Sequence, residues 1–269
     1  MSGKQIRLQR LFDRGSNVVV VAVDHGAQFG VLPGIVDLPA AVEGLSGADG
    51  ILINPGTLDQ CDSVFARKDA PVLISRLTWT TSYCFPWGYD QAHTAAVMTP
   101  QEALFRGAEM VAACCVIRTG DQTVDAENVR IFSAITRQKE ACGLPLIGEF
   151  YPVGAERMPE DELHEVVQAG ARILWELGAD VIKTFYTGRK FAEIPESVPI
   201  PVLVLGAAKT AKESDALEMA HRAVSAGARG VVFGRNVFQA KDPGVFLRAL
   251  GEVVKRGADP SQTARKYAP

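Results

Sequence analysis

The chain repeats one unit along nearly its whole length: a short apolar run, then a longer segment with helical spacing. Each run places Val, Ile, Leu or Ala at successive positions, the pattern of a strand buried on both faces of a parallel sheet. The runs predict eight strands, at Val18–Val23, Ile51–Asn54, Val72–Arg76, Met110–Ile117, Leu146–Phe150, Val181–Phe185, Val202–Leu205 and Gly230–Phe233.

The segments between the later runs have amphipathic helical spacing, and a glycine follows each, where helices commonly stop. The predicted helices are Ala126–Cys142, Glu160–Leu177 and Ser214–Ala226. Eight strand–helix alternations in 269 residues predict an α/β fold of the (βα)8 or TIM-barrel type, with an open doubly wound sheet as the alternative. No Ser/Pro-rich linker divides the sequence, so we expect residues 1–269 to form a single domain.

The composition excludes several classes of partner. The formal net charge is −3 and no run of five like charges occurs, so nothing favours nucleic acid or an anionic membrane surface. Five cysteines without a C-x-x-C motif predict reduced thiols. Because the N-terminus lacks an apolar signal segment and no run is long enough to span a bilayer, we expect a cytoplasmic protein that does not enter a membrane.

A lysine lies within one of the predicted strands. Lys183 lies in Val181–Phe185, and a buried ammonium costs several kcal/mol unless it is paired or neutralised. Desolvation at the C-terminal end of a barrel strand would lower the pKa of this amine from about 10.4, and a neutral amine condenses with a ketone to form an imine. The alternative is an ammonium that extends to a carboxylate at the rim. The polar residues at the ends of the other predicted strands favour a catalytic role for Lys183 over this alternative.

Other polar residues stand where the predicted strands end, which in a barrel is the catalytic face. Asp24 follows the first strand and could pair with Lys183 or act as a base toward a substrate hydroxyl; the alternative is a helix cap or a partner for a buried donor. Tyr151 follows the fifth strand, and its phenol could donate and accept a proton during imine chemistry. A buried tyrosine with a bonded hydroxyl would show the same pattern.

The last two strands end in glycine turns with nearby cations. Gly206 and Lys209 follow the seventh strand, and Gly234 and Arg235 follow the eighth. Glycine permits close approach of the backbone, and helix N–H groups beside a cation form the usual phosphate site of the last two loops of a barrel. The two turns together predict a phosphorylated substrate.

Metal and cofactor chemistry find little support in the sequence. The four histidines show no H-x-H or H-E-x-x-H spacing, and only His25 stands at a predicted strand end. No dinucleotide-binding fingerprint or serine nucleophile motif occurs. We therefore expect an enzyme that needs neither a metal nor another cofactor.

Taken in order, the strand-end residues carry a resemblance to a known family over nearly the full chain. The motifs that resemble the archaeal-type class I fructose-bisphosphate aldolases are Val23-Asp24-His25-Gly26, Tyr151-Pro152-x-Gly154, Ile182-Lys183-Thr184 and Gly234-Arg235-Asn236-Val237-Phe238-Gln239. These enzymes belong to a larger Schiff-base aldolase group with 2-amino-3,7-dideoxy-threo-hept-6-ulosonate synthase and the autoinducer-2 thiolase.

The resemblance implies a (βα)8 barrel in which Lys183 is the Schiff-base residue, Tyr151 the general acid/base and Asp24 the carboxylate that handles the proton of the sugar hydroxyl. The substrate- and phosphate-binding residues expected with them are His25, Gly206, Ala207, Lys209, Gly234 and Arg235. Such enzymes need no metal and are similar in forming homo-oligomers, often decamers.

The implied reaction is reversible cleavage of a phosphorylated ketose, fructose-bisphosphate-like, to a ketose phosphate and an aldehyde. The alternative is a Schiff-base transfer of the transaldolase or thiolase type on a phosphorylated keto-sugar. An isomerase that forms no Schiff base, or a module that only binds sugar phosphates, would have no use for a buried amine.

Three positions depart from the family pattern. Val153 stands where the aldolases tend to carry arginine, and Ala207 replaces the second glycine of the seventh loop. Glu149 stands where the sugar-bisphosphate aldolases usually carry an aromatic or small apolar residue. A lost cation and a gained carboxylate each weaken binding of a second phosphate, so these departures concern the substrate more than the Schiff base.

The stretch Leu77–Thr99 has no clear helix or strand pattern and predicts a long aromatic loop after the third strand. It would lie on the catalytic face or at a subunit contact, since aromatic residues are enriched at interfaces. Its aromatic residues are Trp79, Tyr83, Phe85, Trp87 and Tyr89.

Overall fold

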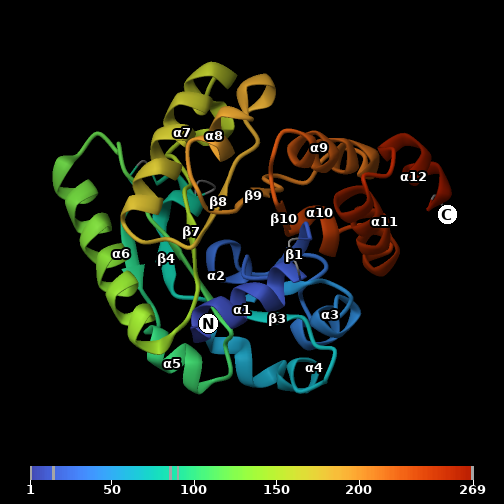
Figure 1. Cartoon of the computed structure of the whole chain (residues 1–269), viewed down its shortest axis with the longest axis horizontal. Helices are drawn as coiled ribbons and strands as arrows, with labels where there is room; N and C mark the ends of the chain where they lie inside the picture. Colours follow the sequence, from blue (N-terminus) through green and yellow to red (C-terminus); the bar gives the residue numbers. More distant parts are fainter. Residues whose placement is uncertain (1, 14–15, 85–86, 90, 268–269) are drawn as a thin grey trace.

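The computed structural model describes residues 2–13, 16–84, 87–89 and 91–267, and within them eight parallel strands close into a barrel surrounded by helices (Figure 1). The order around the barrel is β1-β10-β9-β8-β7-β6-β3-β2. Its strands are β1 (Val18–Ala22), β2 (Gly50–Ile53), β3 (Val72–Arg76), β6 (Met110–Cys114), β7 (Leu146–Glu149), β8 (Val181–Thr184), β9 (Val202–Leu205) and β10 (Gly230–Phe233). The predicted (βα)8 barrel is therefore confirmed, and the open sheet is excluded.

Each predicted strand is present, but five of them end one to three residues earlier than the apolar pattern suggests. The largest difference is the run Met110–Ile117, whose strand ends at Cys114. Beyond this point the chain leaves the sheet and turns through Arg118, a non-glycine residue with φ of 60°. Apolar periodicity reports burial, whereas strand ends depend on hydrogen bonding to neighbours, so the two limits differ at the loops.

Twelve α-helices and four 3₁₀ helices are formed by the described residues. The three predicted helices are confirmed with small shifts at their ends. The largest shift is at the start of α6, which begins four residues earlier than predicted. There the side chain of Asp121 accepts hydrogen bonds from the N–H groups of Thr123 and Val124. The α-helices are α1 (Gly3–Phe12), α2 (Gly26–Phe29), α3 (Leu38–Gly44), α4 (Asp62–Phe65), α5 (Pro100–Phe105), α6 (Gln122–Cys142), α7 (Glu160–Glu176), α8 (Glu193–Glu196), α9 (Glu213–Ser225), α10 (Arg235–Phe238), α11 (Pro243–Arg256) and α12 (Pro260–Lys266). The 3₁₀ helices are η2 (Pro55–Gln60), η3 (Thr81–Tyr83), η5 (Ala155–Arg157) and η6 (Gly188–Lys190).

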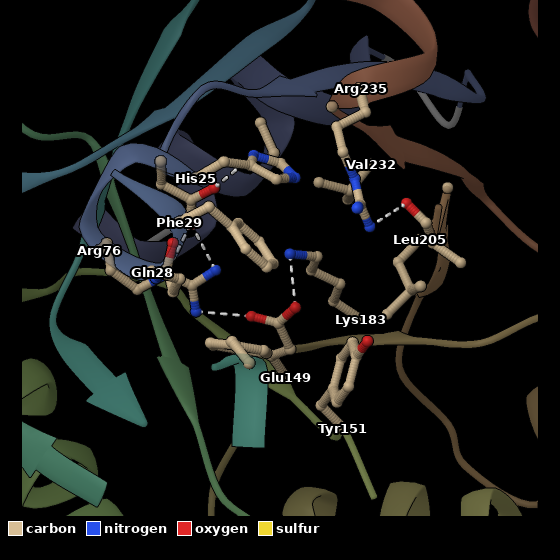
Figure 2. A pocket seen from close by; sticks show the side chains of 16 residues that line it. His25, Gln28, Phe29, Arg76, Glu149, Tyr151, Lys183, Leu205, Val232 and Arg235 are labelled. Carbon is tan, nitrogen blue, oxygen red and sulfur yellow. Dashed lines mark hydrogen bonds and ion pairs between the residues drawn. The ribbon is translucent and has the colours of Figure 1, made fainter. Parts of the chain in front are cut away.

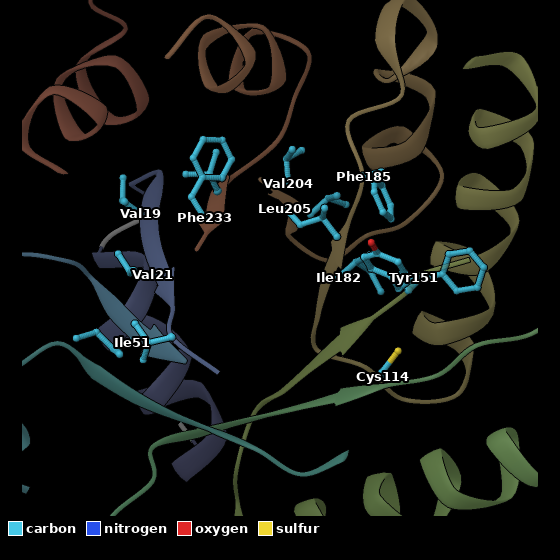
Figure 3. Close-up of a cluster of buried hydrophobic side chains, with 14 of the residues drawn as sticks. Val19, Val21, Ile51, Cys114, Tyr151, Ile182, Phe185, Val204, Leu205 and Phe233 are labelled. Carbon is cyan, nitrogen blue, oxygen red and sulfur yellow. The ribbon is translucent and has the colours of Figure 1, made fainter. Parts of the chain in front are cut away.

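The core has two layers, because side chains alternate between the two faces of a strand. One layer fills the barrel interior and includes Leu11 and Phe12 of α1. Its strand residues are Val18, Val20, Ala22, Leu52, Val72, Ile74, Met110, Ala112, Ile147, Val181, Leu203 and Val232. The larger layer lies between the strands and the helices, and Figure 3 shows part of it, including Val19, Ile182 and Phe233.

The aromatic stretch after β3 is not simply a loop, which corrects one prediction. It contains an antiparallel pair, β4 (Thr78–Thr80) and β5 (Thr94–Ala96), in which Trp79 is paired with Ala95. The alternation in this pair is too short to stand out from the sequence. The ring nitrogen of Trp79 donates to the Ala27 carbonyl at 2.9 Å, so the hairpin is attached to α2. Phe85 lies outside the described residues.

Among the described residues, none of the helices combines the length and the apolar character needed to cross a lipid bilayer.

Candidate active site

The period of two along each strand places charged residues at the C-terminal mouth of the barrel. On β8, Val181 belongs to the interior layer, so Lys183 two positions later also points inward. The same spacing applies to Ile147 and Glu149 on β7. The same spacing of two positions directs Arg76, at the end of β3, and Asp24, just after β1, toward the interior of the barrel. Four strands therefore add a charged layer above the apolar interior.

A cavity at this mouth brings most of the predicted site residues together, and Figure 2 shows their side chains around it. Strand ends and the loops that follow them supply its walls. The lining residues are Ala22, Asp24, His25, Gln28, Phe29, Arg76, Tyr83, Glu149, Tyr151, Lys183, Leu205, Gly206, Ala207, Val232, Gly234 and Arg235. Of the predicted set, Lys209 is not among them.

Lys183 is buried and paired. Its Nζ lies 2.5 Å from Glu149 Oε1, and the two side chains are 7% and 3% exposed. The contact follows from strand register, because Glu149 on β7 is the direct partner of Lys183 on β8. The ammonium therefore does not extend to a rim carboxylate, since its partner is as deeply buried as itself.

Arg76 connects the two carboxylates of the cavity. Its Nε and Nη2 lie 2.8 and 2.7 Å from Asp24 Oδ2. Its Nη1 lies 2.5 Å from Glu149 Oε2, an ion pair whose N–H direction does not meet hydrogen-bond geometry. Of the alternatives for Asp24, the structure therefore contains the contact with a buried donor and not the pairing with Lys183. Asp24 pairs with Arg76, and Lys183 pairs with Glu149.

The cluster is electrically balanced, with two carboxylates opposite a guanidinium and an ammonium. Burial raises the pKa of Asp24, but the charges of Arg76 and Lys183 outweigh it and hold the pKa at about 2. Burial is likewise outweighed at Glu149, whose pKa is lowered by Arg76 and Lys183. Both groups are therefore ionised at neutral pH.

His25 forms a neutral wall of the cavity. Burial lowers its pKa to about 4 against the opposing effect of Asp24, whose Oδ1 lies 3.5 Å from His25 Nδ1. The ring packs edge-on against Phe238. Glycine is required at position 234 because a Cβ there would lie 2.2 Å from His25 Cε1. The lack of a side chain at position 234, in the turn after β10, therefore leaves space for the imidazole ring of His25.

Tyr151 stands one position beyond Phe150, which follows β7, and its ring packs edge-on against Tyr83 and Phe185. Its hydroxyl donates to Glu156 Oε1. Burial and this carboxylate raise the pKa of Tyr151, so the phenol keeps its proton at neutral pH. The hydroxyl therefore has a partner in the resting site, and it remains a proton donor.

The predicted phosphate cup is only partly assembled. Arg235 lines the cavity, where its Nη2 donates to the Ala207 carbonyl at 2.8 Å and its buried Nε has no partner. Ala207 takes a left-handed φ of 47°, a conformation that suits glycine better. Lys209 instead donates from Nζ to the Gln239 carbonyl, outside the cavity. After Gly206 no helix begins until Glu213, so only the turn at Gly234 leads directly into a helix.

The side chain of Asn236 joins the two loops of this region. Its Nδ2 donates to the Gly206 carbonyl at 2.8 Å, and its Oδ1 accepts from the N–H of Thr210 at 2.8 Å. The sequence places Asn236 in one of the family-like motifs but gives it no role. The structure shows that it fixes the loop after β9 against α10.

Sequence reasoning missed Arg76 and Tyr83 as cavity residues and gave Glu149 no part beside Lys183. The signal for Arg76 was present, because it ends an apolar run in the same way that Lys183 interrupts one. The pairing of Glu149 with Lys183 required the register of β7 against β8, which no local pattern contains.

The fold and the site define a (βα)8-barrel protein with a buried, paired lysine at the catalytic end of the barrel. Residues 18–240 match the model of the DeoC/LacD family of aldolases, and the chain belongs to this family. It is a lyase, an aldolase, as predicted.

Related proteins agree with this assignment. An uncharacterised aldolase from Saccharolobus solfataricus is 32% identical, over 96% of this chain and 97% of its own. A 2-amino-3,7-dideoxy-D-threo-hept-6-ulosonate synthase from Halobacterium salinarum is 29% identical, over 96% and 94%. A crystal structure of an archaeal fructose 1,6-bisphosphate aldolase superposes with a TM-score of 0.79 at 28% identity, covering 94% of this chain and 100% of that one.

A second archaeal fructose-1,6-bisphosphate aldolase structure has its catalytic lysine covalently bound to the carbinolamine intermediate of its substrate. It superposes with a TM-score of 0.78 at 28% identity, over 94% of this chain and 99% of that one.

The substitution Asp24→Asn should make the free energy of unfolding depend less strongly on pH in the acid range. A native pKa of about 2, below the ordinary 3.8, means that ionised Asp24 stabilises the fold above pH 3.8 and that this contribution is lost as the pH falls through 2. The difference in unfolding free energy between wild type and variant should shrink by about 2 kcal/mol between roughly pH 6 and pH 2. Denaturant titrations at each pH measure it. Asp59→Asn, at an 80% exposed side chain, is the control; equal acid limbs in Asp24→Asn and wild type would contradict the expectation.

Proposed function

We propose that this protein is a class I aldolase that reversibly cleaves a phosphorylated ketose, fructose-bisphosphate-like, through a Schiff base on Lys183. The observation that carries the proposal is the position of Lys183, a buried amine lining the cavity at the catalytic mouth of the barrel. Support also comes from similar structures, which are fructose-1,6-bisphosphate aldolases. One of them is named as Schiff-base-forming, and another has its catalytic lysine bound to the carbinolamine intermediate. A buried amine that only filled space would not be placed in an open cavity.

The reaction begins when the Lys183 ammonium gives up one proton to water and the neutral amine adds to the substrate ketone. A C–N bond forms, the C=O double bond becomes single, and one N–H proton passes to the ketone oxygen, which gives a carbinolamine. Loss of the carbinolamine hydroxyl as water needs a proton donor. We assign this step to Tyr151, which lines the same cavity as Lys183 and whose raised pKa keeps the phenol protonated at neutral pH. To give up this proton, the hydroxyl turns from Glu156 Oε1 to the carbinolamine. The products of this step are an imine on Lys183 and one water molecule.

Carbon–carbon cleavage then requires loss of a proton from the hydroxyl two carbons away from the imine. We assign this proton to Asp24, whose Oδ1 is not bonded by Arg76, which holds Oδ2. With a pKa of about 2, Asp24 passes the proton on to water rather than keeping it. The aldehyde leaves, and the enamine on Lys183 is protonated at carbon and hydrolysed to release the ketose phosphate.

Arg235 is the proposed phosphate-binding group, with Gly206, Ala207, Gly234 and His25 as neighbouring walls. Of the three cationic side chains that line the cavity, Arg76 and Lys183 are bound to carboxylates. Arg235 contacts a carbonyl and retains a buried Nε without a partner. This balance of charge favours a substrate that places one phosphate in the cavity.

We also propose that the enzyme works in the cytoplasm as a homo-oligomer. All five cysteines are free thiols, as expected of a reducing compartment. Support for oligomers comes from large apolar side chains on the surface, with Phe105, Trp87 and Tyr89 93%, 53% and 50% exposed. Light scattering on the purified protein should give a mass that is a multiple of 28.9 kDa; a mass equal to one chain would contradict the proposal.

Borohydride reduction in the presence of fructose 1,6-bisphosphate should attach the substrate covalently to Lys183, because the imine is the reducible adduct of this mechanism. Peptide mass spectrometry locates the adduct. Lys183→Met should abolish labelling, whereas Lys190→Met, which removes an exposed amine paired with Asp161, should leave it unchanged. Labelling of another lysine would contradict the assignment.

Activity should also survive treatment with a metal chelator. A loss of activity that added zinc restores would point to the metal-dependent mechanism.

Arg235→Ala should raise the KM for a phosphorylated ketose by roughly 10–100-fold, equivalent to ~1.5–3 kcal/mol for a charge-assisted hydrogen bond. The KM for the corresponding unphosphorylated ketose should change little. Lys209→Ala is the matched control, since this amine bonds the Gln239 carbonyl outside the cavity, and its effect should be much smaller. Steady-state kinetics with both substrates measure these changes. An unchanged KM in Arg235→Ala would remove the main support for the phosphate.

A further inference from the structure

The contact between Glu149 and Lys183 has a consequence for the imine. An ammonium and a ketone combine to give a protonated imine and one water, so the positive charge at Nζ is present before and after the step. Only the protonated imine withdraws electrons strongly enough to assist cleavage of the carbon–carbon bond. A cation buried at this depth is unstable unless an opposite charge faces it.

Glu149 is placed to supply that charge. Its Oε1 lies 2.5 Å from Lys183 Nζ, the atom that becomes the imine nitrogen. Its Oε2 faces Arg76 Nη1 at 2.5 Å, and Arg76 is itself held by two contacts to Asp24. Figure 2 shows the carboxylate of Glu149 between the two cations. A carboxylate fixed in this way needs no reorganisation when the imine forms.

We propose that Glu149 is a catalytic residue, the counterion that keeps the imine on Lys183 protonated, and that Arg76 is the positioning residue that holds this carboxylate in place. The inference rests on the proposed Schiff-base function. It extends that function by giving a role to the carboxylate that replaces the aromatic or small apolar residue typical of the sugar-bisphosphate aldolases. Glu149 touches the reacting nitrogen, whereas Arg76 acts through Glu149.

The surroundings of the pair allow the idea to be tested by pH. The titratable and charged groups that face Glu149 and Lys183 are Asp24 and His25 after β1, Arg76 on β3, Tyr83 in η3, Cys114 on β6, Tyr151 and its partner Glu156 after β7, and Arg235 in α10.

The groups among these whose pKa values are shifted, together with the guanidinium groups, keep a constant charge over the range in which the imine is expected to titrate. Asp24 and His25 have pKa values of about 2 and 4, well below neutrality. Burial raises the pKa values of Tyr83, Cys114 and Tyr151 above their ordinary values of 10.0, 9.0 and 10.0. The guanidinium groups do not titrate in proteins. An alkaline change between about pH 6 and pH 9 therefore reports the imine itself.

Removal of the carboxylate charge should lower the pKa of the imine, because an opposite charge at this distance shifts a pKa by about 1–3 units. Glu149→Gln keeps the shape and removes the charge. Glu149→Asp keeps the charge and shortens the side chain by one methylene. If Glu149 serves only to offset Arg76 in the fold, neither substitution will move the alkaline limb of imine trapping.

The experiment measures the rate of covalent trapping by cyanoborohydride, which reduces protonated imines, with dihydroxyacetone phosphate as the probe. Intact-protein mass spectrometry follows the modified fraction from about pH 6 to pH 9. For Glu149→Gln, the alkaline limb of the rate should move down by about 1–3 pH units relative to wild type, while Glu149→Asp should stay close to wild type. Circular dichroism confirms that each variant is folded.

The outcomes separate the two proposals. Wild-type protein that is not trapped on Lys183 would overturn the Schiff-base function itself. Trapping in wild type together with the same alkaline limb in Glu149→Gln would overturn the counterion alone. Where Glu149→Gln fails to fold, the double variant Arg76→Gln/Glu149→Gln, which keeps the cluster neutral, replaces it and is compared with Arg76→Gln. The alkaline limb of the double variant should lie below that of Arg76→Gln; equal limbs would overturn the counterion.

Discussion

The active site depends on one buried arrangement of charges, in which Arg76 lies between Asp24 and Glu149, and Glu149 in turn holds Lys183. Each ion taken from water costs several kcal/mol, and this cost is offset only when every charge has a partner in good geometry. Removal of one member leaves another unpaired, at a typical cost of about 3–5 kcal/mol. The cluster is therefore a constraint on the whole mouth of the barrel and not a set of independent pairs.

The barrel makes this arrangement possible. Inward positions of the strands form an apolar layer, with Leu11 and Phe12 of α1 in the same cluster, so the charges lie above a region that excludes water. Above them the loops supply His25, Tyr151 and Arg235 as walls of the cavity. A cavity with an apolar base and one side open to solvent strengthens the attraction within an ion pair and still admits a ligand.

Membership of the DeoC/LacD aldolases is consistent with the barrel fold and with Lys183 at its mouth. The positions that depart from the archaeal aldolase pattern distinguish this chain from those enzymes. Glu149 brings a carboxylate to Lys183 Nζ and to Arg76 Nη1. Ala207 keeps the left-handed backbone of a glycine and directs its carbonyl to Arg235. Glu149 adds a negative charge to the cavity, whereas Ala207 changes the loop after β9 without changing its charge.

By itself the sequence determined the class of fold and the position of the lysine, because both are local properties. Apolar runs of strand length record burial wherever they occur, and Lys183 is conspicuous as a charge within such a run. Tyr151 and Arg235 could be found in the same way, as polar residues at strand ends. Arg76 could have been found by this rule, since it ends the run Val72–Arg76.

The tertiary structure alone decided which charges meet. Register between parallel strands sets Glu149 beside Lys183, and closure of the barrel carries Arg76 from β3 across to both carboxylates. It also placed Lys209 outside the cavity and formed a hairpin within the aromatic stretch. A strand's own residues record that its side chains are buried, but not which neighbour they face, because register is fixed by the packing of the whole barrel.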